Sequence, residues 1–216
     1  MRPSLDLRCY LVTGSGDPEH ILEVVRRAVD GGCGIVQVRS KPIDALDLYE
    51  LTAAVAREVG DRATVLVDDR GRYTPTPAIS LALMREGLPV HGVHDGQTDL
   101  PIPAVRELHG PDAVVGLTTG TRELVEAANE YGDLIDYVGA GPYRPTPTKD
   151  SGRAPLGVEG YREIVAVSQV PVVAIGFVRA GDAADLAATG VAGLAVVRGL
   201  MEAADPQEYA ARLIAG

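Results

Sequence analysis

The strongest chemical signal in this 216-residue sequence is a run in which polar residues alternate with valines, Val36-Gln37-Val38-Arg39-Ser40-Lys41. Alternate residues of a strand share one face, so Gln37, Arg39 and Lys41 point one way and the valines point the other. Charged groups facing a protein interior need a partner. An amide, a guanidinium and an ammonium on one face suit a diphosphate or polyphosphate. An exposed strand edge with ordinary surface charges is the alternative interpretation.

Two carboxylates follow later strand candidates at corresponding places. Asp69 lies in Asp68-Asp69-Arg70 after the third candidate, and Asp99 closes the loop after the fourth. Neighbouring parallel strands end close together, so both carboxylates could share Mg²⁺, which binds one or two carboxylates, phosphate oxygens and water. Taken alone, a carboxylate at a strand end is more often a helix cap or an ion-pair partner.

A long loop at residues 141–155 follows the sixth strand candidate. It carries Thr146, Thr148 and Lys149, whose side chains can donate hydrogen bonds to an anion. Long loops in compact barrels are often lids. A proline-rich surface loop is the alternative.

Glycines follow the last two strand candidates, in Ile175-Gly176-Phe177 and Val197-Arg198-Gly199. Barrels frequently bind a substrate phosphate at this place, on backbone N–H groups. Gly176, Val197 and Arg198 are therefore candidate phosphate-binding residues. Close packing against a helix explains the glycines equally well.

Short apolar, β-branched runs must position these residues, and helical patterns separate the runs. Near-continuous apolar strands are typical of a parallel sheet covered on both faces. Eight strands alternating with eight helical segments predict an α/β protein, a (β/α)₈ barrel forming one domain over residues 1–216. The strand candidates are Cys9–Thr13, Ile35–Arg39, Thr64–Asp68, Gly92–His94, Val114–Leu117, Tyr137–Ala140, Val172–Ile175 and Gly193–Val197. The clearest helical segments are Pro18–Asp30, Asp44–Gly60, Thr121–Tyr131 and Ala180–Thr189.

Composition excludes several classes of partner. The formal net charge of −10 argues against nucleic acid or an anionic membrane, because neutralising phosphates needs clustered Lys and Arg. Cys9 and Cys33 are too few for a disulfide framework and are expected to be buried thiols. The first ten residues hold no apolar run typical of a signal peptide, so we expect a cytoplasmic protein. The sequence leaves a homo-oligomer open.

Taken in order along the chain, these pieces resemble the thiamine-phosphate synthase family. The likeness runs from about Tyr10 to the C-terminus. It rests on Tyr10–Thr13, Val36–Lys41, Asp68–Arg70, Gly92–His94 with Gly96-Gln97, Asp99–Pro101, Pro111–Gly116, Pro145–Lys149, Pro155–Gly157 and Val173–Gly176. The resemblance implies a TIM barrel transferase that joins hydroxymethylpyrimidine diphosphate to hydroxyethylthiazole phosphate and releases pyrophosphate.

The resemblance also implies roles for residues of this chain. Four match the family's diphosphate-binding positions: Gln37, Arg39, Lys41 and Lys149. Asp69 and Asp99 match its magnesium ligands, so Mg²⁺ is the expected cofactor. Tyr10 matches a tyrosine of the pyrimidine pocket, and Thr118 stands where the family usually has Ser. Thr146 and Thr148 match threonines near the thiazole phosphate.

The family is understood to ionise its diphosphate substrate first, giving a cation that the thiazole nitrogen captures. That dissociative substitution needs no protein nucleophile, and the sequence offers no Ser-His-Asp or Cys-His arrangement. Arg39, Lys41 and Lys149 would activate the diphosphate by stabilising the leaving anion.

Four residues depart from the family pattern. Asp68 replaces an Asn and would repel a diphosphate unless a metal or Arg70 offsets its charge. Phe177 replaces a glycine and could obstruct the phosphate cradle, Arg198 replaces a small residue, and Asp95 replaces an apolar one.

These departures keep two alternatives open. One is a synthase-like transferase with a different phosphorylated acceptor, and the other is a non-catalytic or regulatory relative that binds thiazole phosphate. The related thiazole tautomerase typically has a histidine after the fifth strand, where this chain has Leu117-Thr-Thr-Gly-Thr121.

Overall fold

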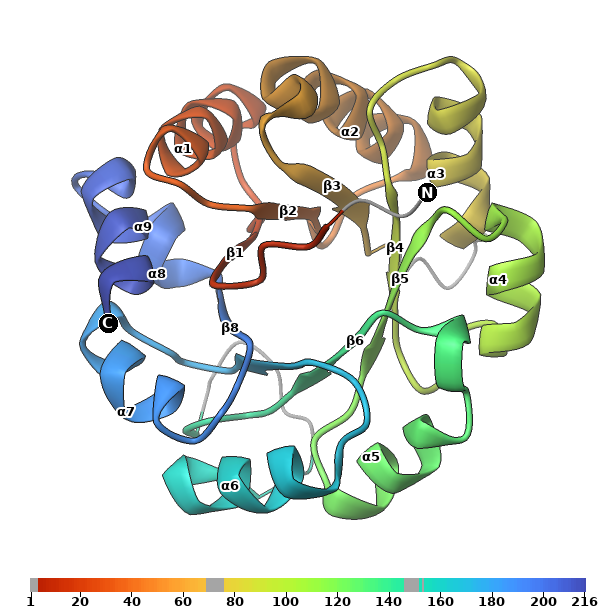
Figure 1. Ribbon diagram of the computed structural model, residues 1–216. Coiled ribbons are helices and arrows are strands. Elements are labelled where there is room, and N and C mark those ends of the chain that lie inside the picture. The colour runs from red at the N-terminus through yellow and green to blue at the C-terminus, as the bar shows by residue number, and fades with distance from the viewer. Residues whose placement is uncertain (1–3, 69–75, 146–151, 153) are drawn as a thin grey trace.

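Eight parallel strands close into a barrel, and helices form a ring outside it (Figure 1). The computed structural model describes residues 4–68, 76–145, 152 and 154–216. Each strand pairs with its neighbours in chain order, and the last pairs with the first, which confirms the predicted (β/α)₈ architecture. The strands are β1 (Cys9–Val12), β2 (Ile35–Val38), β3 (Thr64–Val67), β4 (Gly92–Asp95), β5 (Val114–Thr118), β6 (Tyr137–Ala140), β7 (Val172–Ile175) and β8 (Gly193–Val196).

Helices cover the outer faces of the strands. They are α1 (Pro18–Asp30), α2 (Ala45–Val59), α3 (Thr76–Arg85), α4 (Ile102–His109), α5 (Arg122–Asn129), α6 (Gly157–Val167), α7 (Ala183–Ala187), α8 (Arg198–Met201) and α9 (Pro206–Ala215). The helical segment expected at Ala180–Thr189 is shorter, because a 3₁₀ turn at Ala180–Asp182 precedes α7. Two helices follow β8 where the sequence predicted one, and α9 lies beside α1 (Figure 1).

Side chains of the strands alternate between two apolar cores. Val36 and Val38 of β2 point outward and belong to the large core between strands and helices. Ile35 of the same strand belongs to the small core inside the barrel, together with Tyr10 and Tyr137. This confirms the predicted alternation in β2 and places Gln37 in the barrel interior.

Side chains cap the starts of two helices. Asp17 caps α1 by accepting a hydrogen bond from the Glu19 backbone N–H, and Pro18 follows in the first turn. Thr121 caps α5 in the same way through Leu124. Side-chain oxygens satisfy N–H groups that the helix itself leaves unpaired.

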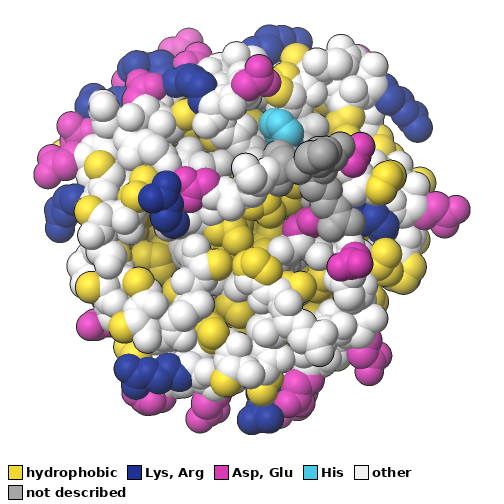
Figure 2. Space-filling model, in the orientation of Figure 1, with side chains coloured by type: hydrophobic (Ala, Val, Ile, Leu, Met, Phe, Trp, Pro, Cys, Tyr) yellow, Lys and Arg dark blue, Asp and Glu magenta, His cyan; other side chains and the backbone are white. Residues whose placement is uncertain are grey.

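The two cysteines are free thiols and buried, as predicted. Among the described residues, no helix is both long enough and apolar enough to cross a membrane. On the face shown in Figure 2, charged side chains lie mainly around the rim and apolar side chains gather near the centre.

Candidate active site

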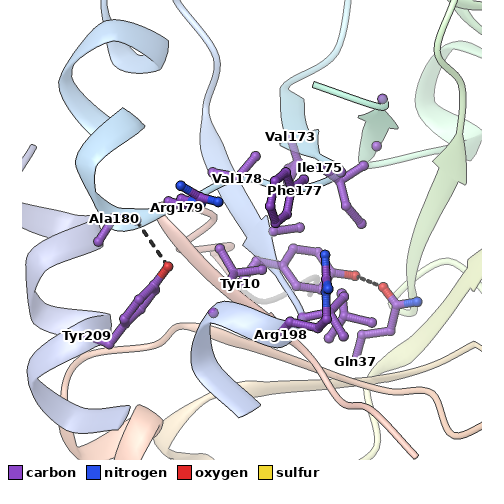
Figure 3. Close-up of a pocket in the computed structure, with 18 of the residues that line it drawn as sticks. Tyr10, Gln37, Val173, Ile175, Phe177, Val178, Arg179, Ala180, Arg198 and Tyr209 are labelled. Carbon is purple, nitrogen blue, oxygen red and sulfur yellow. Dashed lines mark hydrogen bonds between the residues drawn. The ribbon is translucent and has the colours of Figure 1, made fainter. Parts of the chain in front are cut away.

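A cavity of about 770 Å³ opens where the carboxyl ends of the strands meet. Its volume is within the range of small-molecule sites, and this end of the barrel carries the active site in TIM-barrel enzymes. Figure 3 shows side chains from β1, β2, β7 and α8 around it. Eight of the predicted site residues line the cavity: Tyr10, Gln37, Arg39, Asp68, Thr118, Gly176, Val197 and Arg198.

Other predicted residues are not brought into this lining. Half-buried Lys41, in the loop after β2, and half-buried Asp99, in the loop after β4, do not line the described cavity. Their roles stay predictions. Four more predicted residues lie outside the described residues: Asp69, Thr146, Thr148 and Lys149.

Gln37 links two sides of the barrel interior through its amide. Its Nε2 donates to the Asp68 carboxylate at 3.0 Å, and its Oε1 accepts from the Tyr10 hydroxyl at 2.5 Å (Figure 3). A carboxylate can only accept, so Asp68 forces the NH₂ group of Gln37 toward itself and the amide oxygen toward Tyr10. Gln37 and Tyr10 are 4% and 1% exposed, so neither amide nor phenol can turn to solvent instead.

The connection continues across the barrel through three more residues. The hydroxyl oxygens of Tyr10 and Tyr137 lie 2.7 Å apart. His94 Nδ1 lies 2.8 Å from the Tyr137 hydroxyl, and His94 Nε2 lies 2.9 Å from Thr118 Oγ1. The His94 ring also stacks on Tyr137, with centroids 5.5 Å apart. We call these six residues the barrel network: Asp68, Gln37, Tyr10, Tyr137, His94 and Thr118.

The chemistry of the donors fixes the direction of the barrel network. Tyr10 gives its only hydroxyl proton to Gln37, so its oxygen accepts from Tyr137. Tyr137 therefore accepts from His94, which must carry its proton on Nδ1. His94 Nε2 and the Thr118 hydroxyl share the last hydrogen bond of the network. From His94 Nδ1 onward, every donor points toward Asp68. Burial raises the pKa of both tyrosines, so both hydroxyls stay protonated.

Two strand glycines make room for this arrangement. A Cβ at Gly116 of β5 would lie 2.2 Å from Tyr137 Cζ and 2.6 Å from His94 Nδ1. A Cβ at Gly139 of β6 would lie 3.1 Å from His94 Cε1. Glycine inside a strand often marks such a close approach. A side chain at position 116 would collide with both rings, and one at position 139 would crowd His94.

Arg39 is positioned from two directions at the rim of the cavity. The Thr13 hydroxyl donates to the Arg39 carbonyl at 3.0 Å and accepts from the Arg39 N–H at 2.8 Å. The Arg39 Nε lies 3.3 Å from the Asp68 carboxylate. The sequence suggests a metal or Arg70 as the group that offsets the negative charge of Asp68. Arg39 and Gln37 supply the counterpart, and Arg70 lies outside the described residues.

The glycines after β7 and β8 are explained by packing. Gly176 has φ +99°, and a Cβ there would lie 2.6 Å from the Pro142 Cα. A Cβ at Gly199 would lie 2.3 Å from the Tyr209 hydroxyl. Both also line the cavity, so close packing and an accessible backbone occur together at these positions.

Phe177 has an unusual backbone and two cationic neighbours. Its φ of 61° is in the left-handed region, which costs a non-glycine residue about 1 kcal/mol or more. The guanidinium carbons of Arg179 and Arg198 lie 4.6 Å and 5.0 Å from the centre of its ring. We call Phe177, Arg179 and Arg198 the arginine stack (Figure 3). All three line the cavity, so Phe177 forms part of its wall.

Sequence reasoning missed several lining residues. Tyr137, Arg179 and His94 line the cavity but are not among the predicted site residues. Tyr137 lies in the middle of an apolar strand, where its sequence neighbours do not reveal its role. The signal that could have found it is the pair of strand glycines, Gly116 and Gly139, on the inward face next to it.

The described residues contain no group of three or more His, Cys, Asp or Glu side chains that could hold a metal. This result does not test a site of two carboxylates completed by phosphate oxygens and water. Asp99 supplies hard oxygen of the kind that Mg²⁺ prefers. Its Oδ2 accepts the Gly96 backbone N–H at 2.5 Å, which orients the carboxylate in the loop after β4.

A family model described as thiamine monophosphate synthase matches residues 9–200, nearly the whole chain. A thiamine-phosphate synthase from Corynebacterium efficiens is 67% identical over 216 residues, which are 100% of this chain and 97% of the relative. The chain belongs to the thiamine monophosphate synthase family. A second thiamine-phosphate synthase, from Corynebacterium jeikeium, is 56% identical over 99% of this chain and 96% of its own length.

Solved structures agree with this family. Thiamine phosphate pyrophosphorylase from Pyrococcus furiosus has a TM-score of 0.79 and 30% identity, covering 96% of this chain and 94% of that one. A 3-hexulose-6-phosphate synthase has a TM-score of 0.70 at 15% identity over 96% of this chain and 98% of its own, a likeness that shows the fold alone.

Proposed function

We propose that the chain joins hydroxymethylpyrimidine diphosphate to hydroxyethylthiazole phosphate and releases pyrophosphate. Family membership carries the broader statement: the chain is a thiamine-phosphate synthase, a transferase of thiamine biosynthesis. The observation that carries the finer proposal is the composition of the cavity, in which a buried hydrogen-bonded network adjoins Arg39 on one side and further arginines on another.

The bond changes require charge stabilisation more than a nucleophile. The C–O bond between the pyrimidine methylene and the diphosphate breaks, and its electron pair leaves with pyrophosphate. The thiazole nitrogen lone pair then forms the new C–N bond, giving a thiazolium. A cation near the diphosphate stabilises the leaving anion as charge develops on it. We assign this role to Arg39, Lys41 and Lys149.

The barrel network suits the heterocycle rather than the phosphates. Its tyrosines and Gln37 are neutral, and the charge of Asp68 is matched by Arg39. Thr118 and Tyr10 line the cavity and present oxygen atoms to it, and the proton direction is fixed at Tyr10. Fixed donors and acceptors can bind an aminopyrimidine edge without reorganising.

Mg²⁺ is part of the proposal, held by Asp69 and Asp99. When bound, it would supply positive charge to the diphosphate oxygens. Asp99 supports this proposal through its oriented hard-oxygen donor.

We further propose that the partners are phosphorylated small molecules, not nucleic acid or membrane, and that the protein is cytoplasmic. The net charge of −10 supports the exclusion of polyanionic partners.

A second candidate is the same chemistry on a different phosphorylated acceptor, which Phe177 and Arg198 favour. Separate calorimetric titrations of the two substrates discriminate: binding of the diphosphate without binding of thiazole phosphate favours the altered acceptor. The near-complete coverage of relatives named as synthases counts against a non-catalytic relative.

The direct test is pyrophosphate release by purified protein with Mg²⁺ and both substrates. We expect release that falls strongly in Lys41→Ala. No release above that variant's level would refute the proposal.

A further inference from the structure

The outer part of the cavity needs directed cations to bind any anion. The chain carries a net charge of −10, and Glu202, Asp205 and Glu208 line this part. The Asp205 carboxylate is already engaged, because it pairs with Arg27 at 3.0 Å and caps α9 through the Glu208 N–H. The field of the whole protein therefore repels an anion, and attraction must come from guanidinium groups held at fixed places.

Arg179 and Arg198 meet this requirement. The π electrons of an aromatic ring attract a guanidinium group. The ring offers no hydrogen-bond acceptor to the N–H groups, so these remain able to donate to a ligand. Within the described part of the chain, neither guanidinium forms an ion pair or donates a hydrogen bond, although both line the cavity. Their donors are therefore oriented but uncommitted.

Arg144 shows what a structural arginine looks like in the same region. Its guanidinium lies 4.4 Å from the centre of the Tyr143 ring and also donates to both oxygens of Asp182 at 2.6 Å. Asp182 is the acid nearest in sequence to Arg179. It accepts a hydrogen bond from the backbone N–H of Arg179 but none from the Arg179 guanidinium. Arg144 occupies the carboxylate that could otherwise neutralise Arg179.

Phe177 contacts both arginines with its ring, and its backbone is strained. Arg179 comes from the loop after β7, and Arg198 begins α8 after β8 (Figure 3). Phe177 has φ 61°, where glycine would be unstrained. A strained residue retained in a cavity wall points to a functional contact.

We infer that the arginine stack binds the phosphate of the acceptor substrate, with Arg179 and Arg198 as direct ligands and Phe177 as their positioning residue. The inference rests on the proposed function for the identity of the acceptor, and it assigns the acceptor's phosphate to side chains. Two planar guanidinium forks can contact a phosphate monoester from two directions.

The test is two-substrate kinetics of Arg179→Gln, with Arg122→Gln as the control. Arg122 pairs with Glu126 on the exposed face of α5 and does not line the cavity. We expect Arg179→Gln to raise the KM for hydroxyethylthiazole phosphate about tenfold, the loss of one charged hydrogen-bonding group. The KM for the pyrimidine diphosphate and the rate with unphosphorylated hydroxyethylthiazole should stay unchanged. Equal losses with both acceptors, or no change in the KM, would overturn the inference.

Phe177 has its own readout. Phe177→Leu keeps the backbone strain and removes the ring, so we expect the KM for the phosphorylated acceptor to rise severalfold. Phe177→Tyr keeps the ring and should restore a KM close to that of the unmodified protein. Equal kinetics of the Leu and Tyr variants would contradict the positioning role.

Calorimetric titration with inorganic phosphate separates this inference from the proposed function. If the unmodified protein forms no product but binds phosphate, and Arg179→Gln weakens that binding, the anion site stands and the proposed reaction fails. If product forms and Arg179→Gln binds phosphate and acceptor normally, the reaction stands and the arginine site fails.

Discussion

At the inner end of the cavity, each polar side chain of the barrel network has a partner inside the protein, and one carboxylate sets the direction of the chain of hydrogen bonds. At the outer end, Arg179 and Arg198 lie over a strained phenylalanine without any ion pair among the described residues. The polar groups of the inner end are hydrogen-bonded to each other before a ligand binds, whereas the guanidinium groups of the outer end remain able to donate to a ligand. This difference matches a neutral heterocycle at one end and a phosphate at the other.

Breaking the inner end at its centre should have the largest effect. Gln37→Leu removes both links at once and leaves the Tyr10 hydroxyl and the Asp68 carboxylate without their buried partner. We expect kcat/KM to fall about 100-fold, because Tyr10 and Asp68 lose the amide that fixes their orientation in the cavity. Steady-state pyrophosphate release measures this loss, and circular dichroism checks that the variant is folded. Activity near that of the unmodified protein would show that the barrel network does not position substrate.

Two tyrosine variants distinguish an effect on the site from an effect on the rest of the core. Tyr137→Phe interrupts the barrel network, whereas Tyr161→Phe removes an equally buried hydroxyl that donates to Ala140 outside the cavity. Both should lower the free energy of unfolding by about 1 kcal/mol. Tyr137→Phe alone should lower kcat/KM, by about tenfold. Urea unfolding with parallel kinetics makes the comparison, and equal kinetic losses in both variants would assign the effect to stability.

The outer end should show the reverse pattern, a change in binding with little change in stability. Phe177→Gly relieves the left-handed strain of about 1 kcal/mol but loses two cation–π contacts of about 0.5–1 kcal/mol each. We expect the free energy of unfolding to stay within about 1 kcal/mol and the acceptor KM to rise severalfold. A large stability loss with an unchanged KM would make Phe177 a purely structural residue.

The smallest effect concerns Asp182, the carboxylate engaged by Arg144. Burial alone would raise the pKa of Asp182, but hydrogen bonds from the Arg144 guanidinium and the Arg179 N–H more than offset it and lower the pKa. A lowered pKa stabilises the fold above the ordinary value near 3.8, and that stability is lost as pH falls through the folded pKa. Arg144 is 38% exposed, so screening limits the contribution to about 1 kcal/mol at most.

Asp182→Asn should remove this dependence. Unfolding curves between pH 6 and about 3 should show a smaller loss of stability in the variant than in the unmodified protein. Identical losses in the two proteins would show that the pair contributes nothing to acid sensitivity.

The strands could be predicted to within one residue because their sequences are apolar runs ended by polar residues, as at Val67-Asp68. Alternation along β2 also placed Gln37 correctly in the interior. Residues joined across the barrel could not be predicted in the same way. Tyr10 and Tyr137 are 127 positions apart, and only closure of the barrel brings their hydroxyl groups together.

The arginine stack illustrates a second limit of sequence reasoning. From the sequence, a phenylalanine where the family usually has glycine could obstruct a phosphate cradle by occupying its space. The positive φ of Phe177 turns the ring toward Arg179 and Arg198, so the residue builds a wall of the cavity. Neither the backbone angle of Phe177 nor the contact between the loops after β7 and β8 can be predicted from the neighbouring residues in the sequence.

The most direct test of two independent ends is a double-mutant cycle with Tyr137→Phe and Arg198→Ala, measured by two-substrate kinetics. The barrel network and the arginine stack share no residue, so their effects on kcat/KM should multiply to within a factor of about two. Arg198→Ala should raise only the acceptor KM, and Tyr137→Phe should leave that KM unchanged. Two results would contradict the division of the cavity into two ends. One is a kcat/KM of the double variant no lower than that of the less active single variant, and the other is a rise of the acceptor KM in both single variants.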